Sequence, residues 1–218
     1  MDTALGDAGA VDLSWLSPED QRDAWTLGDD ALRYVARLIA LVRPRRVLEF
    51  GSGVSTRVMA AACAGLDEPA TVVSLETDPV YERRTRLALA GDATDVARVE
   101  LTHLVARRWY GRNLPVYDLP VSVLQGPAPE LVLVDGPPLP LGGREGSLFQ
   151  AIHLAGEGTL VVLDDADRTS EQTALARAEE TFTAAVDVVR LTGFAKGLAV
   201  VVVHHPVGRP AMPPVPAP

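Results

Sequence analysis

Carboxylate side chains stand at the ends of four apolar runs of the sequence. They are Glu49, Glu76, Asp135 and the adjacent pair Asp164 and Asp165. Each run has the continuous apolar character of a strand buried in a parallel sheet. The carboxyl ends of parallel strands meet at one edge, which is where ligands bind in open α/β sheets. The spacing therefore predicts that these acids share one rim.

The first of these runs, VLEFGSGVST at 47–56, predicts a sharp turn from a strand into a helix. Gly51 and Gly53 would let the backbone approach a ligand that a Cβ would block. Hydroxyl donors gather near the predicted helix start at Ser52, Ser55 and Thr56. A phosphate-binding P-loop needs a lysine followed by Ser or Thr after its second glycine, and this stretch has none.

Thr56 and Glu49 narrow the class of ligand, whereas Glu76 does not discriminate between a dinucleotide and a ligand that carries an amino-acid group. Thr56 stands where a dinucleotide-binding motif has its third glycine. A carboxylate at Glu49 would repel a pyrophosphate but suits the ammonium group of an amino-acid ligand. Glu76, at the end of the second run, suits a pair of ribose hydroxyls in either class of ligand. An NAD-dependent oxidoreductase is thus disfavoured but stays an alternative.

Apolar runs alternate with helical patterns between residues 28 and 205. Strands are expected at 46–50, 71–76, 98–104, 130–136, 159–165, 186–191 and 197–203, and the residues between 105 and 129 are expected to be irregular. This alternation predicts an α/β fold of Rossmann-like, doubly wound type, with helices on both faces of a mostly parallel, seven-stranded sheet. The last two runs would form a hairpin.

The two ends of the chain differ from this domain. Residues 1–27 begin with small and acidic residues, and we expect them to be loose. Residues 206–218 include six prolines among thirteen positions, which predicts a disordered tail.

The composition of the chain limits which binding partners and which cellular compartment we expect for the protein. The formal net charge is −9, and the arginines are scattered among acids, which disfavours nucleic acid as a partner and favours a small-molecule substrate. No run is long and apolar enough to span a membrane, and the first residues lack the features of a signal peptide. The single cysteine, Cys63, excludes an internal disulfide and fits a cytoplasmic location. The sequence does not predict the oligomeric state, and a homodimer stays open.

Four motifs in order, VLEFGSGVST, VVSLETD, LVLVDGPP and TLVVLDDADR, resemble those of class I S-adenosylmethionine-dependent methyltransferases. The likeness spans residues 28–204 and includes an antiparallel last strand in the sheet. It implies an enzyme whose cofactor is S-adenosylmethionine, with Gly51 and Gly53 beside its methionine part. It also implies that Glu49 faces the cofactor's amino group and that Glu76 binds the ribose. The other cofactor-binding residues implied are Ser52, Ser55, Thr56, Thr77, His103 and Asp135. A cofactor-binding partner protein without catalysis is a further alternative.

Asp135 and Asp164 stand 29 positions apart, a separation similar to that in metal-dependent O-methyltransferases of the catechol and natural-product kinds. This resemblance implies a Mg²⁺ site formed by Asp135, Asp164 and Asp165. Such an ion would hold a substrate hydroxyl as its oxyanion for methylation. Asp135 and Asp164 are therefore candidate catalytic residues, and His153 is a candidate base. Two departures count against a metal: Pro138 replaces the lysine of the catechol enzymes, and Pro137 replaces a second acid of some sugar-modifying relatives. In addition, Arg168 offers the aspartates an ion-pair partner instead.

Overall fold

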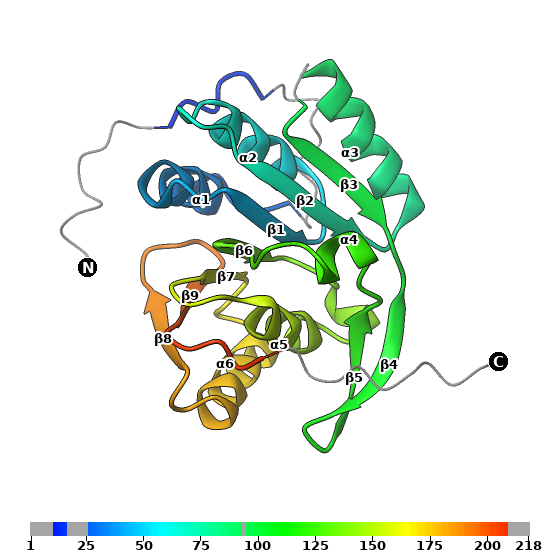
Figure 1. The fold of residues 1–218 in the computed structure, drawn as a ribbon, viewed down its shortest axis with the longest axis vertical. Helices are drawn as coiled ribbons and strands as arrows, with labels where there is room; N and C mark the ends of the chain where they lie inside the picture. The colour runs from blue at the N-terminus through cyan, green and yellow to red at the C-terminus, as the bar shows by residue number, and fades with distance from the viewer. Residues whose placement is uncertain (1–10, 17–25, 93–94, 209–218) are drawn as a thin grey trace.

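A computed structural model describes residues 11–16, 26–92 and 95–208 (Figure 1). It confirms the predicted α/β fold with a seven-stranded sheet, in the strand order β3-β2-β1-β6-β7-β9-β8. These strands are β1 (Arg46–Phe50), β2 (Thr71–Glu76), β3 (Ala97–Leu101), β6 (Leu131–Val134), β7 (Leu160–Asp164), β8 (Val186–Leu191) and β9 (Leu198–Val203). β9 pairs antiparallel with both β7 and β8, whereas the pairs from β3 to β7 are all parallel.

Helices cover both faces of the sheet, as the sequence predicts (Figure 1). They are α1 (Asp29–Val42), α2 (Val54–Ala64), α3 (Pro79–Gly91), α4 (Val121–Leu124), α5 (Glu145–Leu154) and α6 (Thr169–Thr181). Alternate residues of a strand point to opposite faces. In β1, accordingly, Val47 packs with residues of α1 and α2, whereas Leu48 and Phe50 pack with residues of α5 and α6. Within the described residues, no helix combines the length and the apolar character needed to cross a bilayer.

The region between residues 98 and 129 differs from the expectation. The third strand ends at Leu101, and a separate antiparallel hairpin follows, formed by β4 (Leu104–Trp109) and β5 (Arg112–Tyr117). Its two-residue turn has positive φ at both Tyr110 and Gly111 (49° and 76°), which matches the twist of a hairpin. The prediction of an irregular segment was wrong here. The sequence at the turn, Tyr110–Gly111, lacks the Asn-Gly or Asp-Gly pair that usually indicates a hairpin.

Most of the two terminal segments lies outside the described residues, namely 1–10, 17–25 and 209–218. In the described part of the first segment, Leu13 and Leu16 are buried against α1 and α2. In the last segment, the carbonyl of Gly208 contacts His153. These described parts therefore pack on the domain.

A tight contact sets the position of α5 beside the hairpin. A short 3₁₀ helix, η1 (Leu139–Leu141), is followed by Gly142 and Gly143, both at positive φ, and α5 then begins. A Cβ added to Gly146 would lie 2.0 Å from the carbonyl oxygen of Pro115 in β5. The backbones of α5 and β5 therefore approach more closely than any other residue type at 146 would allow.

Gly146→Ala is expected to lower the free energy of unfolding by about 1–3 kcal/mol, because the new methyl group must push backbone aside. Denaturant titration measures the loss. Gly91→Ala is the matched control, since no described atom lies within 4 Å of the Cβ it would add. Equal stability of Gly146→Ala and the parent protein would contradict the tight contact.

Candidate active site

The carboxyl ends of β1, β2, β6 and β7 form the predicted rim, and the loop after β1 lies at its centre. Gly51 donates its N–H to the carbonyl of Leu75 (2.8 Å). A Cβ on Gly136, which follows β6, would lie 2.4 Å from the Tyr117 hydroxyl and 3.3 Å from the Cα of Gly51. No described atom lies within 4 Å of a Cβ built on Gly53. The loop is thus closely packed against the β6 turn at Gly51 and open at Gly53.

Glu49 lies beneath this loop and not at its open side. Its side chain is fully buried, and its carboxylate accepts hydrogen bonds from the hydroxyls of Ser55, Thr56 (2.6 Å) and Ser74. The Thr56 hydroxyl also accepts the N–H of Gly53 (3.0 Å). Burial raises the pKa of Glu49 to about 7, although the three hydroxyl donors act in the opposite direction. In the structure, Glu49, Ser55 and Thr56 thus stabilise the loop after β1 through hydrogen bonds.

Glu76 ends β2 next to the same loop. One carboxylate oxygen accepts the hydroxyl of Ser52 (2.8 Å), and the other accepts the N–H groups of Thr77 (2.6 Å) and Asp78 (3.0 Å). Asp78 is itself the N-cap of α3. His103 follows β3, with its side chain 70% exposed and 3.4 Å from a carboxylate oxygen of Asp118. Among the predicted cofactor residues, the structure brings Ser52, Glu76 and Thr77 into contact.

Asp135, Asp164 and Asp165 converge as predicted, and an arginine lies among them. One ligand oxygen from each aspartate lies within 4.8 Å of the others. Nη2 of Arg144 is 2.6 Å from Asp135 Oδ1, and Nη1 is 2.6 Å from Asp165 Oδ2. Nη1 also donates to the backbone carbonyl of Asp164 (2.6 Å). Arg168 is a second, more exposed partner of Asp165 at 2.8 Å.

The carboxylates around Arg144 are not equally paired. Oδ2 of Asp164 is buried, lies 3.8 Å from Arg144 Nη2 and has no hydrogen-bond partner among the described residues. Burial raises the pKa of Asp164, and the Arg144 charge opposes that shift. Burial likewise raises the pKa of Asp135 well above its ordinary value, again against the effect of Arg144. Arg144 is thus the main positive charge that opposes the effect of burial on the pKa values of Asp135 and Asp164.

Several solved structures that resemble this chain are described as methyltransferases. An O-methyltransferase from Bacillus cereus in complex with SAH is 19% identical, with 83% of this chain and 84% of that chain covered and a TM-score of 0.59. The SAH-bound methyltransferase of Podospora anserina is 16% identical, with 84% and 82% covered and a TM-score of 0.62. A precorrin-6y C5,15-methyltransferase from Geobacter metallireducens is 13% identical, with 90% and 97% covered and a TM-score of 0.60.

The chain has the class I methyltransferase fold. No protein-family model and no curated protein sequence matches it. At these identities the likeness extends to the fold and not to the reaction, which must be argued from the residues on the rim.

His153, the candidate base, does not lie with the acids. It is eight residues along α5 from Glu145, which corresponds to about 12 Å at the helical rise. Its Nε2 is 2.6 Å from the Tyr110 hydroxyl, its Nδ1 is 2.7 Å from the carbonyl oxygen of Gly208, and its ring stacks on Trp109. The structure therefore separates His153 from the rim.

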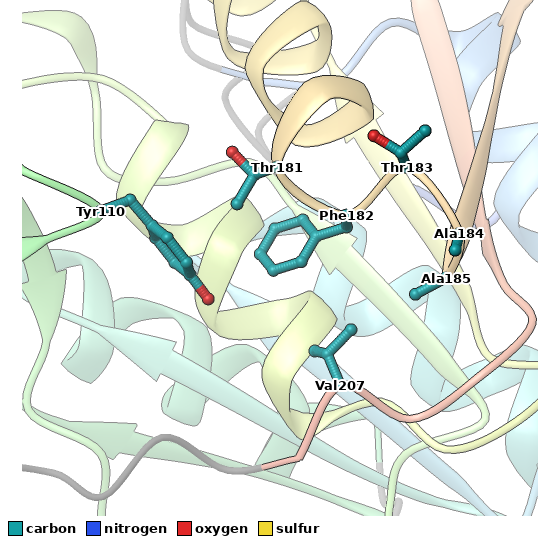
Figure 2. Close-up of a pocket in the computed structure, with 7 residues that line it drawn as sticks. All are labelled: Tyr110, Thr181, Phe182, Thr183, Ala184, Ala185 and Val207. Carbon is teal, nitrogen blue, oxygen red and sulfur yellow. The ribbon is translucent and has the colours of Figure 1, made fainter.

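Tyr110 and Phe182, whose rings pack edge to face with centroids 5.5 Å apart, line a cleft of about 480 Å³ near His153 (Figure 2). The cleft is lined also by Thr181, Thr183, Ala184, Ala185 and Val207. It lies at the tip of the β4–β5 hairpin, beyond the end of α6, whereas the acids lie before the start of α6. Tyr110 thus lines a cleft that is separate from the acids of the rim.

Arg144 is the residue at the rim whose position the sequence did not reveal. Its guanidinium contacts side chains 9 and 21 positions away, on two different strand ends. The one local signal is the Gly142–Gly143 pair, which bends the chain just before α5. That signal indicates a turn but does not tell which way the next side chain points.

Proposed function

We propose that this protein transfers a methyl group from S-adenosylmethionine to a small-molecule acceptor. The observation that carries the proposal is the loop after β1, open at Gly53, with the Glu76 carboxylate beside it at the end of β2. Two of the structural neighbours hold SAH on the same fold, which supports the choice of cofactor. The expected acceptor atom is a hydroxyl oxygen, in keeping with neighbours described as O-methyltransferases.

The residues on the rim fit such a cofactor in both shape and chemistry. When bound, S-adenosylmethionine supplies a methyl group on a positively charged sulfur. Gly51 and Gly53 would let the backbone lie against its methionine part, since no side chain fills the space at Gly53. Glu76 would accept hydrogen bonds from the two ribose hydroxyls, in place of the one that it accepts from Ser52. His103 would lie at the adenine end.

Glu49 would act on the cofactor through the loop. Because it holds Ser55 and Thr56 from below, it fixes where the N-terminus of α2 lies. The direct contact with the cofactor's amino group, implied by the resemblance, is therefore not part of this proposal. Since methyl transfer is an in-line displacement, rigid positioning of this kind would supply much of the rate.

Asp135 lies beside Gly51 of the loop after β1, since its backbone carbonyl carbon is 3.6 Å from a Cβ built on Gly51, and in this proposal it would face the acceptor. We assign no step to Mg²⁺, because the Arg144 guanidinium lies between the carboxylates that would bind the ion. His153 is likewise left out, because it is hydrogen-bonded away from the rim. The proposal covers one domain, residues 28–205, in a cytoplasmic protein that acts on small molecules and not on nucleic acid.

Calorimetric titration with S-adenosylhomocysteine, repeated with NAD⁺, tests the proposal. We expect dissociation in the micromolar range for the first and none for the second. Binding of NAD⁺ in place of S-adenosylhomocysteine would make the protein a candidate oxidoreductase. Binding of S-adenosylhomocysteine without methylation of any acceptor, over a panel of catechols, phenols and sugars, would instead indicate a non-catalytic binding protein.

Glu76→Ala is expected to weaken the binding of S-adenosylhomocysteine by about tenfold or more, because two hydrogen bonds to a charged acceptor are lost. The same calorimetric titration measures it. The matched control is Glu130→Gln, because Glu130 receives the backbone N–H groups of Arg45 and Arg46 at the opposite edge of the sheet. Unchanged affinity in Glu76→Ala would show that the ribose binds elsewhere.

A further inference from the structure

The Arg144 guanidinium lies among three aspartates that the sequence pattern suggested as ligands of a metal ion. Its two terminal nitrogens each lie 2.6 Å from a carboxylate oxygen, of Asp135 and of Asp165. The third carboxylate, of Asp164, lies 3.8 Å from Nη2. The side chain of Arg144 is only 6% exposed, so this is an internal group and not a surface ion pair.

The backbone around Arg144 leads its side chain into this position. Gly142 and Gly143 turn the chain at positive φ, and a Cβ on Gly142 would lie 2.4 Å from the Pro115 ring. The close contact of Gly146 with β5 then fixes the start of α5. The guanidinium also donates to the backbone carbonyl of Asp164, a bond that does not depend on any carboxylate charge. Arg144 is therefore anchored in part by contacts that do not involve the aspartate carboxylates.

A divalent cation would need the space that the guanidinium fills. Mg²⁺ binds oxygens at about 2.1 Å, so two of its ligands lie at most about 4.2 Å apart. The three aspartate oxygens, within 4.8 Å of one another, nearly meet this limit. Asp135 Oδ1 and Asp165 Oδ2 each lie 2.6 Å from a guanidinium nitrogen, so an ion bound by these two oxygens would have to displace Arg144. The ion and the guanidinium therefore exclude one another.

We propose that Arg144 is a built-in replacement for the divalent cation on this rim, and that the protein works without Mg²⁺. The arginine supplies the positive charge that holds Asp135 beside the loop after β1. The part about methyl transfer rests on the proposed function, whereas the exclusion of metal does not. Removing the guanidinium should uncover three carboxylates that bind a divalent cation.

Titration of Arg144→Ala with MnCl₂ and MgCl₂, followed by calorimetry, tests this proposal without any enzyme assay. We expect the parent protein to show no saturable binding of Mn²⁺. The variant should bind Mn²⁺ saturably, with a dissociation constant at least about tenfold below the lower limit that the titration sets for the parent protein. The midpoint of thermal unfolding should also rise with added cation in the variant alone. Arg168→Ala is the matched control, because it removes a partner of Asp165 but leaves Arg144 in place.

Two outcomes would overturn the proposal. Stoichiometric binding of Mn²⁺ by the parent protein would mean that Arg144 moves aside for the ion. A folded Arg144→Ala that binds no cation would mean that the aspartates do not form a cation site. If Arg144→Ala does not fold, Arg144→Gln, which removes the charge but keeps all three carboxylates, takes its place in the same titration.

These readouts are separate from the test of cofactor binding. If S-adenosylhomocysteine does not bind but Arg144→Ala gains a cation site, the proposed function fails and the replacement stands. If the cofactor binds and the parent protein also binds Mn²⁺, the proposed function stands and the replacement of the cation by Arg144 fails. Indifference of the parent protein's methyl transfer to EDTA would then be the result expected from both proposals together.

Discussion

Replacing Arg144 by methionine is expected to lower the free energy of unfolding by about 3–5 kcal/mol, the range for breaking a buried ion pair from one side. Methionine keeps most of the side chain's length, so the loss comes from charge and hydrogen bonds. Asp135 and Asp164 would then lack their nearest cation, whereas Asp165 would keep Arg168 and Asp164 would keep only the weaker effect of Lys196. Urea denaturation near pH 8 measures the loss.

The pH dependence of this loss identifies its cause. Burial already raises the pKa of both Asp135 and Asp164, and removing the Arg144 charge would raise them further. As the pH falls through those pKa values, the carboxyls become neutral and need no cation. The deficit of Arg144→Met should therefore shrink toward low pH.

Arg168→Met is the control for Arg144→Met, since its side chain is 37% exposed and its loss should cost about 1 kcal/mol or less. A deficit in Arg144→Met that is equally small would show that the aspartates do not depend on Arg144. A large deficit that does not change with pH would point to lost packing instead.

Glu49→Gln is expected to remove a pH-dependent loss of stability of about 3 kcal/mol. Burial raises the pKa of Glu49 from its ordinary 4.5 to about 7 in the folded protein. A group whose pKa is higher in the folded state gives its full stabilisation below the unfolded pKa. That stabilisation is lost as the pH rises through the folded pKa. The parent protein should therefore lose stability between about pH 4.5 and pH 7, relative to Glu49→Gln.

Denaturant titrations at intervals from about pH 4 to pH 9 measure this difference. The quantity to compare is the change with pH and not the offset, because glutamine also alters the hydrogen bonds with Ser55, Thr56 and Ser74. Glu68→Gln, at an exposed position, is the control and should run parallel to the parent protein. A constant difference between parent and Glu49→Gln at every pH would show that the loop stabilises the charged carboxylate fully.

The local pattern of the sequence predicted most of the sheet. The run 71–76 indicates a strand by its own composition, because its apolar side chains can be buried on both faces of a sheet. The glycine pattern after β1 likewise identified the loop. The β4–β5 hairpin escaped prediction. Its strands, LVARRW and RNLPVY, show neither a continuous apolar run nor a regular alternation of polar and apolar residues, and β5 packs against α5, far along the chain.

By itself the sequence determined the seven strands of the main sheet, the longer helices between them, and the convergence of Asp135, Asp164 and Asp165 on one rim. These follow from local periodicity and from the rule that parallel strands end at one edge. Only the tertiary structure decided that Arg144 enters this cluster, that Glu49 lies under the loop and that His153 lies elsewhere. Those outcomes depend on the direction of single side chains and on what packs beside them. Residues far apart in the chain set both, so no local pattern encodes them.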